Sequence, residues 1–280
     1  MIIRCWGARG SIPVSGRKYL RYGGDTTCLE IRSQDGDILI VDAGTGIRRL
    51  GNRMMAEGGD RFTLFFTHSH WDHMIGFPFF KPIYNEQASF VLYGCPMNQG
   101  NMLELLAAIM KPPHFPVPFH DIKAGIDYRG QCDRPSMVGS IEVASIPISH
   151  PNLGLGYKFK ENGRALVFLT DNELLHLHRG GKRFEDYVEF CRGADLLIHD
   201  AEYTEEDYAT TKGWGHSRYT DALRLALEAG VKSFGLFHHN QDRSDEALDA
   251  MVEDCRRRAR AEGSSLECFA LGQTTELVLD

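Results

Sequence analysis

The residues of this chain best suited to chemistry lie in one short run, Thr67–His73, with the sequence THSHWDH. Three imidazoles and one carboxylate fall within six residues of it. Histidine nitrogen and aspartate oxygen are suitable ligands for zinc and similar divalent ions. The run directly follows the apolar, β-favouring stretch Phe62–Phe66, so a loop at the end of a strand can turn all four side chains into one pocket. The spacing predicts a metal site rather than a chance polar turn.

Short strands and helices must position these side chains. In the first half, strands are predicted at Ile2–Trp6, Thr26–Arg32, Asp37–Asp42, Phe62–Phe66 and Ser89–Tyr93, and helices at Gly46–Glu57 and 101–110. In the second half, strands are predicted at Ile141–Ile148, Gly156–Lys160, Ala165–Leu169, Leu196–His199 and Ser233–Phe237, and helices at Tyr219–Ala229 and Asp245–Glu262. The pattern indicates one α/β domain over residues 1–280.

A proline-rich stretch interrupts this pattern. Lys111–Phe119 contains four prolines, which remove backbone donors and stop helices. We therefore interpret roughly 96–137 as an insertion or lid on the single domain. The aromatic residues and histidines within it could form a lid over a base, although simple packing of the insertion explains them as well; they are His114, Phe115, Phe119 and His120.

Net charge, apolar runs and cysteine spacing limit the classes of function that the chain can have. A net charge of −7, with no basic run longer than the triplet Arg256–Arg258, argues against a broad cationic face for nucleic acid, but bound metal ions could still attract a small phosphorylated substrate. Neither a secretory signal nor a run of 18 apolar residues is visible, so no membrane partner is expected. The seven cysteines are scattered and never spaced C-x-x-C, which favours reduced thiols and a cytoplasmic location.

The H-x-H-x-D-H pattern after a strand resembles the signature of the metallo-β-lactamase superfamily. Three later segments resemble further motifs of that family in the expected order: Ser149-His150-Pro151, Leu169-Thr170-Asp171 and the GLFH segment that ends at His238. The resemblance implies a four-layer αββα sandwich of two mixed β-sheets with helices outside. It places the site at one edge, between the two sheets.

The resemblance also implies a ligand set for two divalent ions, with zinc expected and manganese or iron suited to overlapping ligands. His68, His70 and His150 would hold one ion, Asp72, His73 and His238 the other, and Asp171 would bridge them. Two such ions can convert a bound water to hydroxide near neutral pH, and by the resemblance Asp72 would orient that water or accept its proton. Alternatives stay open: a turn role for His150, a helix cap for Asp171, and His239 as the ligand in place of His238.

The second half resembles the ribonuclease Z branch of the family. Asp195–Ala201 is followed by Gly215-His216-Ser217, and by this resemblance His216 would point at the scissile phosphate with Asp200 supporting it. A histidine there can stabilise negative charge or protonate the leaving oxygen. A carboxylate on its other nitrogen would fix its tautomer and raise its pKa. The alternative is that His216 simply packs beside Trp214.

Departures from that branch argue for a small substrate. The long Gly/Pro-rich arm that grips tRNA is not evident, and ribonuclease Z usually has glutamate where this chain has Asp200. We therefore expect a phosphodiesterase acting on a cyclic nucleotide or an RNA end rather than a tRNA 3′ endonuclease. Arg9, Asp25 and His239 are candidate substrate contacts, although turn chemistry and solvated charge also explain Arg9 and Asp25.

Two other functions stay open on the same metal site. One is a thioesterase or lactonase of the glyoxalase II type, against which the G-H-S segment argues. The other is a non-hydrolytic di-iron or metal-sensing module, which the histidine at position 70 disfavours because di-iron relatives often carry a carboxylate at a histidine position. Relatives are often dimers, so the resemblance makes a homodimer possible, and the sequence leaves the oligomeric state open.

Overall fold

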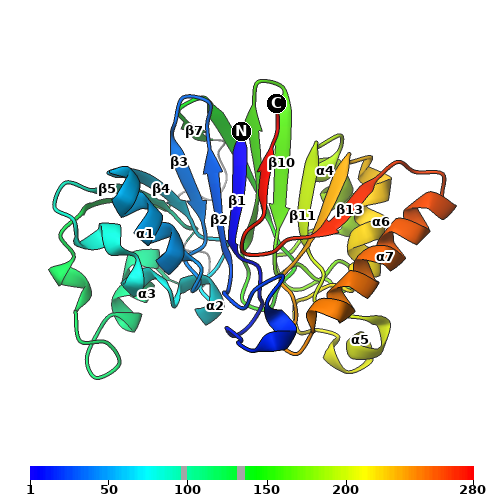
Figure 1. The fold of residues 1–280 in the computed structure, drawn as a ribbon, viewed down its shortest axis with the longest axis horizontal. Helices are drawn as coiled ribbons and strands as arrows, with labels where there is room; N and C mark the ends of the chain where they lie inside the picture. The colour runs from blue at the N-terminus through cyan, green and yellow to red at the C-terminus, as the bar shows by residue number, and fades with distance from the viewer. Residues whose placement is uncertain (96–99, 131–135) are drawn as a thin grey trace.

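Two β-sheets packed face to face form the centre of the molecule, with helices on both outer faces (Figure 1). The structure is a computed structural model that describes residues 1–95, 100–130 and 136–280. Each sheet has seven strands. The predicted αββα sandwich of the metallo-β-lactamase fold is confirmed.

The first sheet comes mainly from the N-terminal half, in the order β14-β1-β2-β3-β4-β5-β6. Neighbours from β14 to β3 are antiparallel, and those from β3 to β6 are parallel. The strands are β1 (Ile2–Gly7), β2 (Cys28–Arg32), β3 (Ile38–Val41), β4 (Arg61–Phe65), β5 (Ser89–Tyr93), β6 (Gly125–Arg129) and β14 (Glu276–Val278).

The second sheet repeats this plan with the C-terminal half, in the order β13-β12-β11-β10-β9-β8-β7. Neighbours from β7 to β10 are antiparallel and those from β10 to β13 are parallel. The strands are β7 (Ser136–Val138), β8 (Ile141–Pro147), β9 (Leu155–Glu161), β10 (Arg164–Leu169), β11 (Leu196–Asp200), β12 (Ser233–Phe237) and β13 (Glu267–Ala270). Because neighbouring parallel strands end at the same edge, the residues after them meet there.

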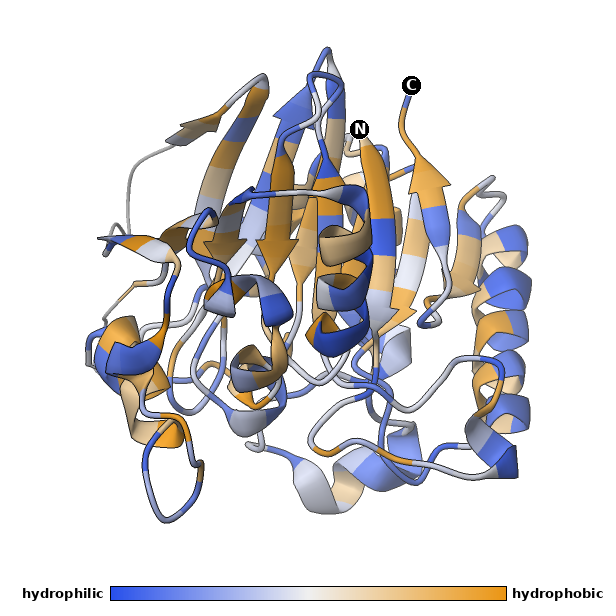
Figure 2. Cartoon of the chain, turned by 60° about the vertical axis from the view of Figure 1, so that its left-hand side comes forward, coloured by the Kyte–Doolittle hydropathy of each residue, from blue (hydrophilic) through white to orange (hydrophobic). Residues whose placement is uncertain are grey.

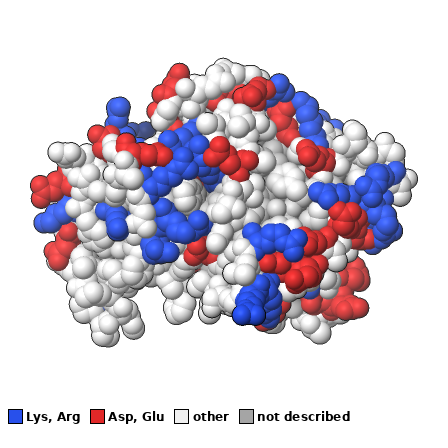
Figure 3. Space-filling view, viewed as in Figure 1, with Lys and Arg blue, Asp and Glu red and all other residues white. Residues whose placement is uncertain are grey.

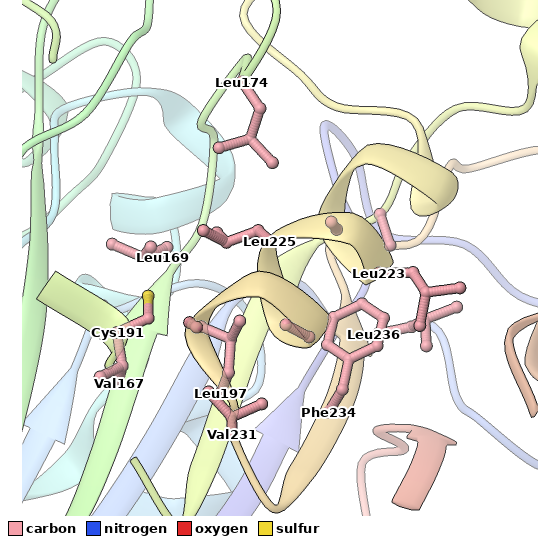
Figure 4. Packing of buried hydrophobic residues seen from close by; sticks show 14 of the residues in the cluster. Val167, Leu169, Leu174, Cys191, Leu197, Leu223, Leu225, Val231, Phe234 and Leu236 are labelled. Carbon is pink, nitrogen blue, oxygen red and sulfur yellow. The ribbon is translucent and has the colours of Figure 1, made fainter. Parts of the chain in front are cut away.

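Three apolar clusters bind the layers together. Between the sheets, alternate side chains of both point inward, and Phe65 of β4 lies with its ring centroid 5.8 Å from that of Phe159 on β9. Outside the second sheet, Leu225 of α6 packs in one cluster with Leu197 and Phe234 (Figure 4). The outer helices accordingly show polar outward and apolar inward stripes (Figure 2).

The helices cover the outer faces or connect strands at the site edge. The α-helices are α1 (Ile47–Glu57), α2 (Trp71–Met74), α3 (Met102–Ile109), α4 (Phe184–Cys191), α5 (Glu205–Thr211), α6 (Tyr219–Ala229) and α7 (Asp245–Ala261). The 3-10 turns are η1 (Arg17–Tyr19), η2 (Phe77–Phe79), η3 (Lys81–Tyr84) and η4 (Phe119–Asp121). No helix of the described chain is long and apolar enough to cross a membrane.

The stretch interpreted as an insertion contributes to both sheets. Its strand β6 pairs with β5 at the edge of the first sheet, and β7 pairs with β8 at the edge of the second. Helix α3 and the proline-rich loop after it lie outside the sheets, at the lower left of Figure 1. A lid role for this part stays a prediction, and residues 96–99 and 131–135 of the stretch lie outside the described ranges.

The cysteines fit the expectation of reduced thiols only in part. Five are free and buried: Cys5, Cys28, Cys191, Cys255 and Cys268. Burial raises the pKa of Cys5 and of Cys191 to about 12, so these thiols stay protonated and unreactive at neutral pH. Cys95, by contrast, is disulfide-bonded, and the expectation is wrong for that residue.

Removing one ring from the layer between the sheets tests this packing. Phe159→Ala should lower the free energy of unfolding by about 3–5 kcal/mol, because the fully buried ring leaves a cavity that both sheets line. Urea unfolding followed by circular dichroism would measure it. Met137→Ala, at a side chain that is 61% exposed, should stay within about 0.5 kcal/mol of wild type. Equal stability of the two variants would contradict the assigned core.

Candidate metal centre

The chain turns sharply after β4 to bring its histidine run into the edge between the sheets. Asp42, directly after β3, accepts hydrogen bonds from the Thr67 backbone N–H and hydroxyl, both at 2.8 Å. The chain then enters the short helix α2, in which Asp72 and His73 are buried and Trp71 is exposed. The predicted loop or helix start is thus a loop followed by one helical turn.

The first candidate metal group consists of His68, His70, His150 and Asp171, whose ligand atoms all lie within 4.8 Å of one another. The His150 Nε2 and His70 Nδ1 atoms are 3.2 Å apart. The His68 Nε2 atom lies 3.4 Å from the nearer Asp171 oxygen. Three imidazoles and one carboxylate therefore converge on one point.

The second group consists of Asp72, His73, His238 and the same Asp171, again within 4.8 Å. The Nε2 atoms of His73 and His238 lie 3.2 Å and 3.3 Å from one Asp171 oxygen. Since the other Asp171 oxygen faces the first group, this carboxylate is placed to serve both groups. The next helix after Asp171, α4, begins only at Phe184, so Asp171 caps no helix.

The donor atoms of both groups fit bound cations. The Nε2 atoms of His68 and His73 are buried and have no hydrogen-bond partner, although buried polar atoms are normally satisfied. Burial lowers the pKa of His150 to about 3 and holds that of His68 well below its usual range, so both rings are neutral and keep a free lone pair at neutral pH. A divalent ion in each group would satisfy these atoms.

Buried partners behind the rings fix which nitrogen points inward. The Nδ1 atom of His73 lies 2.8 Å from Asp42, that of His238 lies 2.9 Å from Glu202, and that of His150 lies 3.0 Å from the Gly215 carbonyl oxygen. Such outer partners set ring orientation and tautomer at metal sites.

Three positioning groups were missed in the sequence. Asp42 and Glu202 lie just after strands, as the predicted ligands do, but no spacing links them to the histidines they contact. The third is a backbone group: the Ser11 N–H donates to Asp72 at 2.8 Å. Ser11 has a left-handed φ of 62°, which no side-chain pattern signals.

His216 and Asp200 lie together beside the second group. The His216 Nδ1 atom is 2.6 Å from Asp200, and the His216 ring stacks on that of His238 with centroids 4.7 Å apart. Burial alone would lower the pKa of His216, but Glu202 and Asp200 outweigh it and raise the pKa to about 9. Trp214 is 63% exposed, whereas His216 is buried against other rings, so packing on Trp214 does not account for its position.

A buried glutamate holds the loop that carries His216. Glu173 accepts hydrogen bonds from the Gly213 and Gly215 backbone N–H groups at 2.7 Å and 2.8 Å, and from the Tyr208 hydroxyl. Gly215 has a φ of +97°, and a Cβ there would lie 2.1 Å from the His150 Nδ1 atom. Only glycine lets this loop approach His150 closely enough for its carbonyl to orient the ring.

The structure does not bring the candidate substrate contacts to the two groups. Arg9 is fully buried, and its guanidinium donates to three backbone carbonyls, those of Gly23, Asn240 and Arg243. Asp25 pairs with Arg49 at 2.9 Å. His239 is also buried and donates from Nε2 to the Leu271 carbonyl at 2.7 Å, so His238 faces the metal groups and His239 does not.

The fold and the convergent histidines define a hydrolase of the metallo-β-lactamase fold. The family described as "Beta-lactamase superfamily domain" matches residues 38–239, and the chain belongs to this superfamily. Among curated relatives, a ribonuclease Z of Haloarcula marismortui is 26% identical over 297 residues, covering 89% of each chain.

Two solved structures show the same fold over nearly the whole chain. The metallo-β-lactamase fold protein YhfI from Bacillus subtilis superposes with a TM-score of 0.71 at 18% identity, covering 99% of this chain and 98% of YhfI. A diphosphatase from the PhnP family has a TM-score of 0.68 at 17% identity, covering 100% of this chain and 98% of its own.

Metal addition should stabilise the protein through Asp171. With free zinc at about 100 times its dissociation constant, the free energy of unfolding should rise by about 2.7 kcal/mol for each ion bound, since the unfolded chain has no assembled site. Asp171→Asn should lose most of this gain, because both groups share the carboxylate. Urea unfolding with and without zinc would measure it, and an equal gain in the variant would contradict the shared role.

Asp42→Asn should weaken metal binding about 10- to 100-fold, because it removes the charge that orients His73. Competition with a chromophoric chelator would give the affinity. Asp35→Asn, at an exposed residue in the turn before β3, is the matched control and should bind metal as wild type does. Unchanged affinity in Asp42→Asn would show that the contact has no part in binding.

Proposed function

We propose that this protein is a phosphodiesterase that hydrolyses a small phosphodiester with two bound divalent ions. The observation that carries the proposal is the His216–Asp200 pair, which lies against His238 and shares a group with Asp171. A metal site for thioester or lactone cleavage has no evident need of an additional, carboxylate-supported imidazole. A phosphodiester does, because its leaving oxygen and its phosphoryl oxygens carry developing negative charge.

The residues take distinct roles in this proposal. When bound, two divalent ions neutralise phosphate charge and lower the pKa of water. Asp72, fixed by the Ser11 N–H, orients the attacking water and takes its proton. His216 is held as an imidazolium by Asp200 and Glu202, so its second nitrogen can donate a proton to the leaving oxygen. Asp200 acts through His216, as a positioning residue.

Zinc is the metal we propose. The two groups offer imidazole and carboxylate ligands, the set that zinc takes in catalytic sites, and include no thiolate. Manganese and iron accept overlapping ligands. Metal analysis of the protein as purified, compared with the rates after loading each metal, would identify the ion.

A small substrate fits the surface and the charge of the protein. Lys and Arg lie interspersed with Asp and Glu on the face in Figure 3, and the net charge is −7. Such a surface offers little to the extended backbone of a tRNA. Ribonuclease Z among the relatives and a PhnP-family diphosphatase among the similar structures both support chemistry at phosphorus. We therefore favour a nucleotide or an RNA end.

The test is hydrolysis of bis(p-nitrophenyl) phosphate by zinc-loaded protein. His216→Ala should lower kcat by about 10²- to 10⁴-fold, the usual contribution of general acid catalysis, while the metal content stays at the wild-type level. His70→Ala, which removes a proposed ligand, should lose both metal and activity. A thioester assayed in parallel distinguishes the alternative hydrolase: fast thioester cleavage with no diester cleavage would overturn the proposal.

A further inference from the structure

An apolar pocket of about 530 Å³ lies between α2 and α3, outside both metal groups. We call it the α2–α3 pocket. Its walls carry the side chains Trp71, Ile75, Phe79, Ile109, His114 and Phe115, and among the described residues no lysine, arginine, aspartate or glutamate lines it. Nothing in the proposed reaction uses these residues.

The pocket adjoins the metal groups through α2. This helix buries Asp72 and His73 on its inner side, while Trp71, between two proposed ligands in sequence, is 75% exposed. Ile75, which follows the helix, is 40% exposed and lines the pocket as well. One helical turn therefore presents metal ligands to one side and the pocket wall to the other.

The opposite wall comes from α3 and the proline-rich loop. The Phe115 ring meets that of Phe79 edge to face, with centroids 5.5 Å apart, and Phe79 is 53% exposed. Exposed aromatic rings of this size cost free energy in water unless they are covered. In Figure 3 the lobe at lower left, where Figure 1 places α3 and this loop, is mostly free of charged side chains on the face shown.

Beyond the Phe79–Phe115 ridge the surface changes character. A second hollow shares Phe79 and Phe115 with the α2–α3 pocket but adds Arg48 and Lys81. Both cations are exposed, and neither makes an ion pair with any residue that the structure describes. From the metal groups outward, the surface is thus first apolar and aromatic and then positively charged.

The change from an apolar to a positively charged surface distinguishes two ligands that could fill the pocket, an acyl chain and a nucleobase. A long acyl chain would need apolar surface to continue past the ridge, where Arg48 and Lys81 lie instead. A nucleobase is flat, uncharged and suited to stacking on aromatic rings. Because the scissile phosphate lies at the metal groups in the proposed reaction, the cations past the ridge suit a further phosphate of the same nucleotide. Charge complementarity therefore favours a nucleotide.

We infer that the α2–α3 pocket is the subsite for a nucleobase of the phosphodiester, stacked on Trp71, Phe79 and Phe115. The inference rests on the proposed function and names the substrate class more narrowly: a phosphodiester that carries a nucleoside on its non-leaving side. Base stacking on aromatic residues tolerates any base, so the subsite selects for an aromatic group rather than for one sequence.

Two measurements on the zinc-loaded protein test the pocket, each with Phe115→Ala, Phe79→Ala and the control Met137→Ala. The first is adenosine binding by calorimetry, with ribose and hexanoate as comparisons. The second is kcat/KM for bis(p-nitrophenyl) phosphate relative to methyl p-nitrophenyl phosphate, in which a methyl group replaces the second ring. Neither phenylalanine is a proposed ligand or acid, and Phe79 is exposed enough that its removal should leave the fold intact.

The inference expects wild type to bind adenosine more tightly than ribose or hexanoate and to prefer the diaryl ester. Each phenylalanine variant should weaken adenosine binding about 10-fold. Its preference for the diaryl ester, measured as the ratio of kcat/KM values, should fall by a similar factor because KM for that ester rises. Met137→Ala should change neither quantity. Unchanged binding in both phenylalanine variants, or tighter binding of hexanoate than of adenosine, would overturn it. A wild type that cleaves neither diester would count against the proposed function, and adenosine binding would still decide what the pocket takes.

Discussion

The carboxylate of Asp171 is the group around which the rest of the site is arranged. It lies buried between the two sheets, within 3.4 Å of imidazole nitrogens on both sides. Burial alone would raise its pKa, but the surrounding rings, those of His238 and His73 foremost, hold the pKa well below the usual range. A buried charge is tolerated only where partners compensate it. The buried negative charge of Asp171 therefore favours a fold in which the histidines that follow strands of both sheets lie next to it.

That requirement extends outward to a further layer of buried acids. Asp42 and Glu202 each face the outer nitrogen of a ring whose inner nitrogen faces Asp171. The backbone at the centre is also unusual, since Asp42, Asp171 and His238 all have left-handed φ values near +50° to +62°. Non-glycine residues adopt this region at a cost, which the surrounding contacts must offset. Buried charge and backbone strain are thus concentrated at the site edge, and the free energy gained from apolar packing elsewhere in the fold offsets their cost.

The sequence predicted most of this arrangement where side-chain type and period carry the information. The seven metal-facing imidazole and carboxylate positions near strand ends, and interior strands such as β5 and β12, follow from local patterns. The edge strands β6, β7, β13 and β14 did not, because short half-exposed strands have weak alternation and are defined by their partners. The sequence suggested that Arg9 is a solvated charge in a loop. In the structure it is buried, and its guanidinium donates hydrogen bonds to three backbone carbonyls from other segments of the chain. Contacts of that kind depend on the assembled fold.

The split of the second metal group between the sheets has a consequence for how the protein matures. His238 lies 166 residues beyond Asp72, and the first loop is tied to the same late segment through Arg9. During synthesis, strands β1 to β6 of the first sheet can form with the histidine run before the last ligand leaves the ribosome. A nascent chain that ends before His238 therefore offers only part of the second ligand group. Tight binding of both ions therefore requires that the two halves have docked, and it would stabilise only the finished protein.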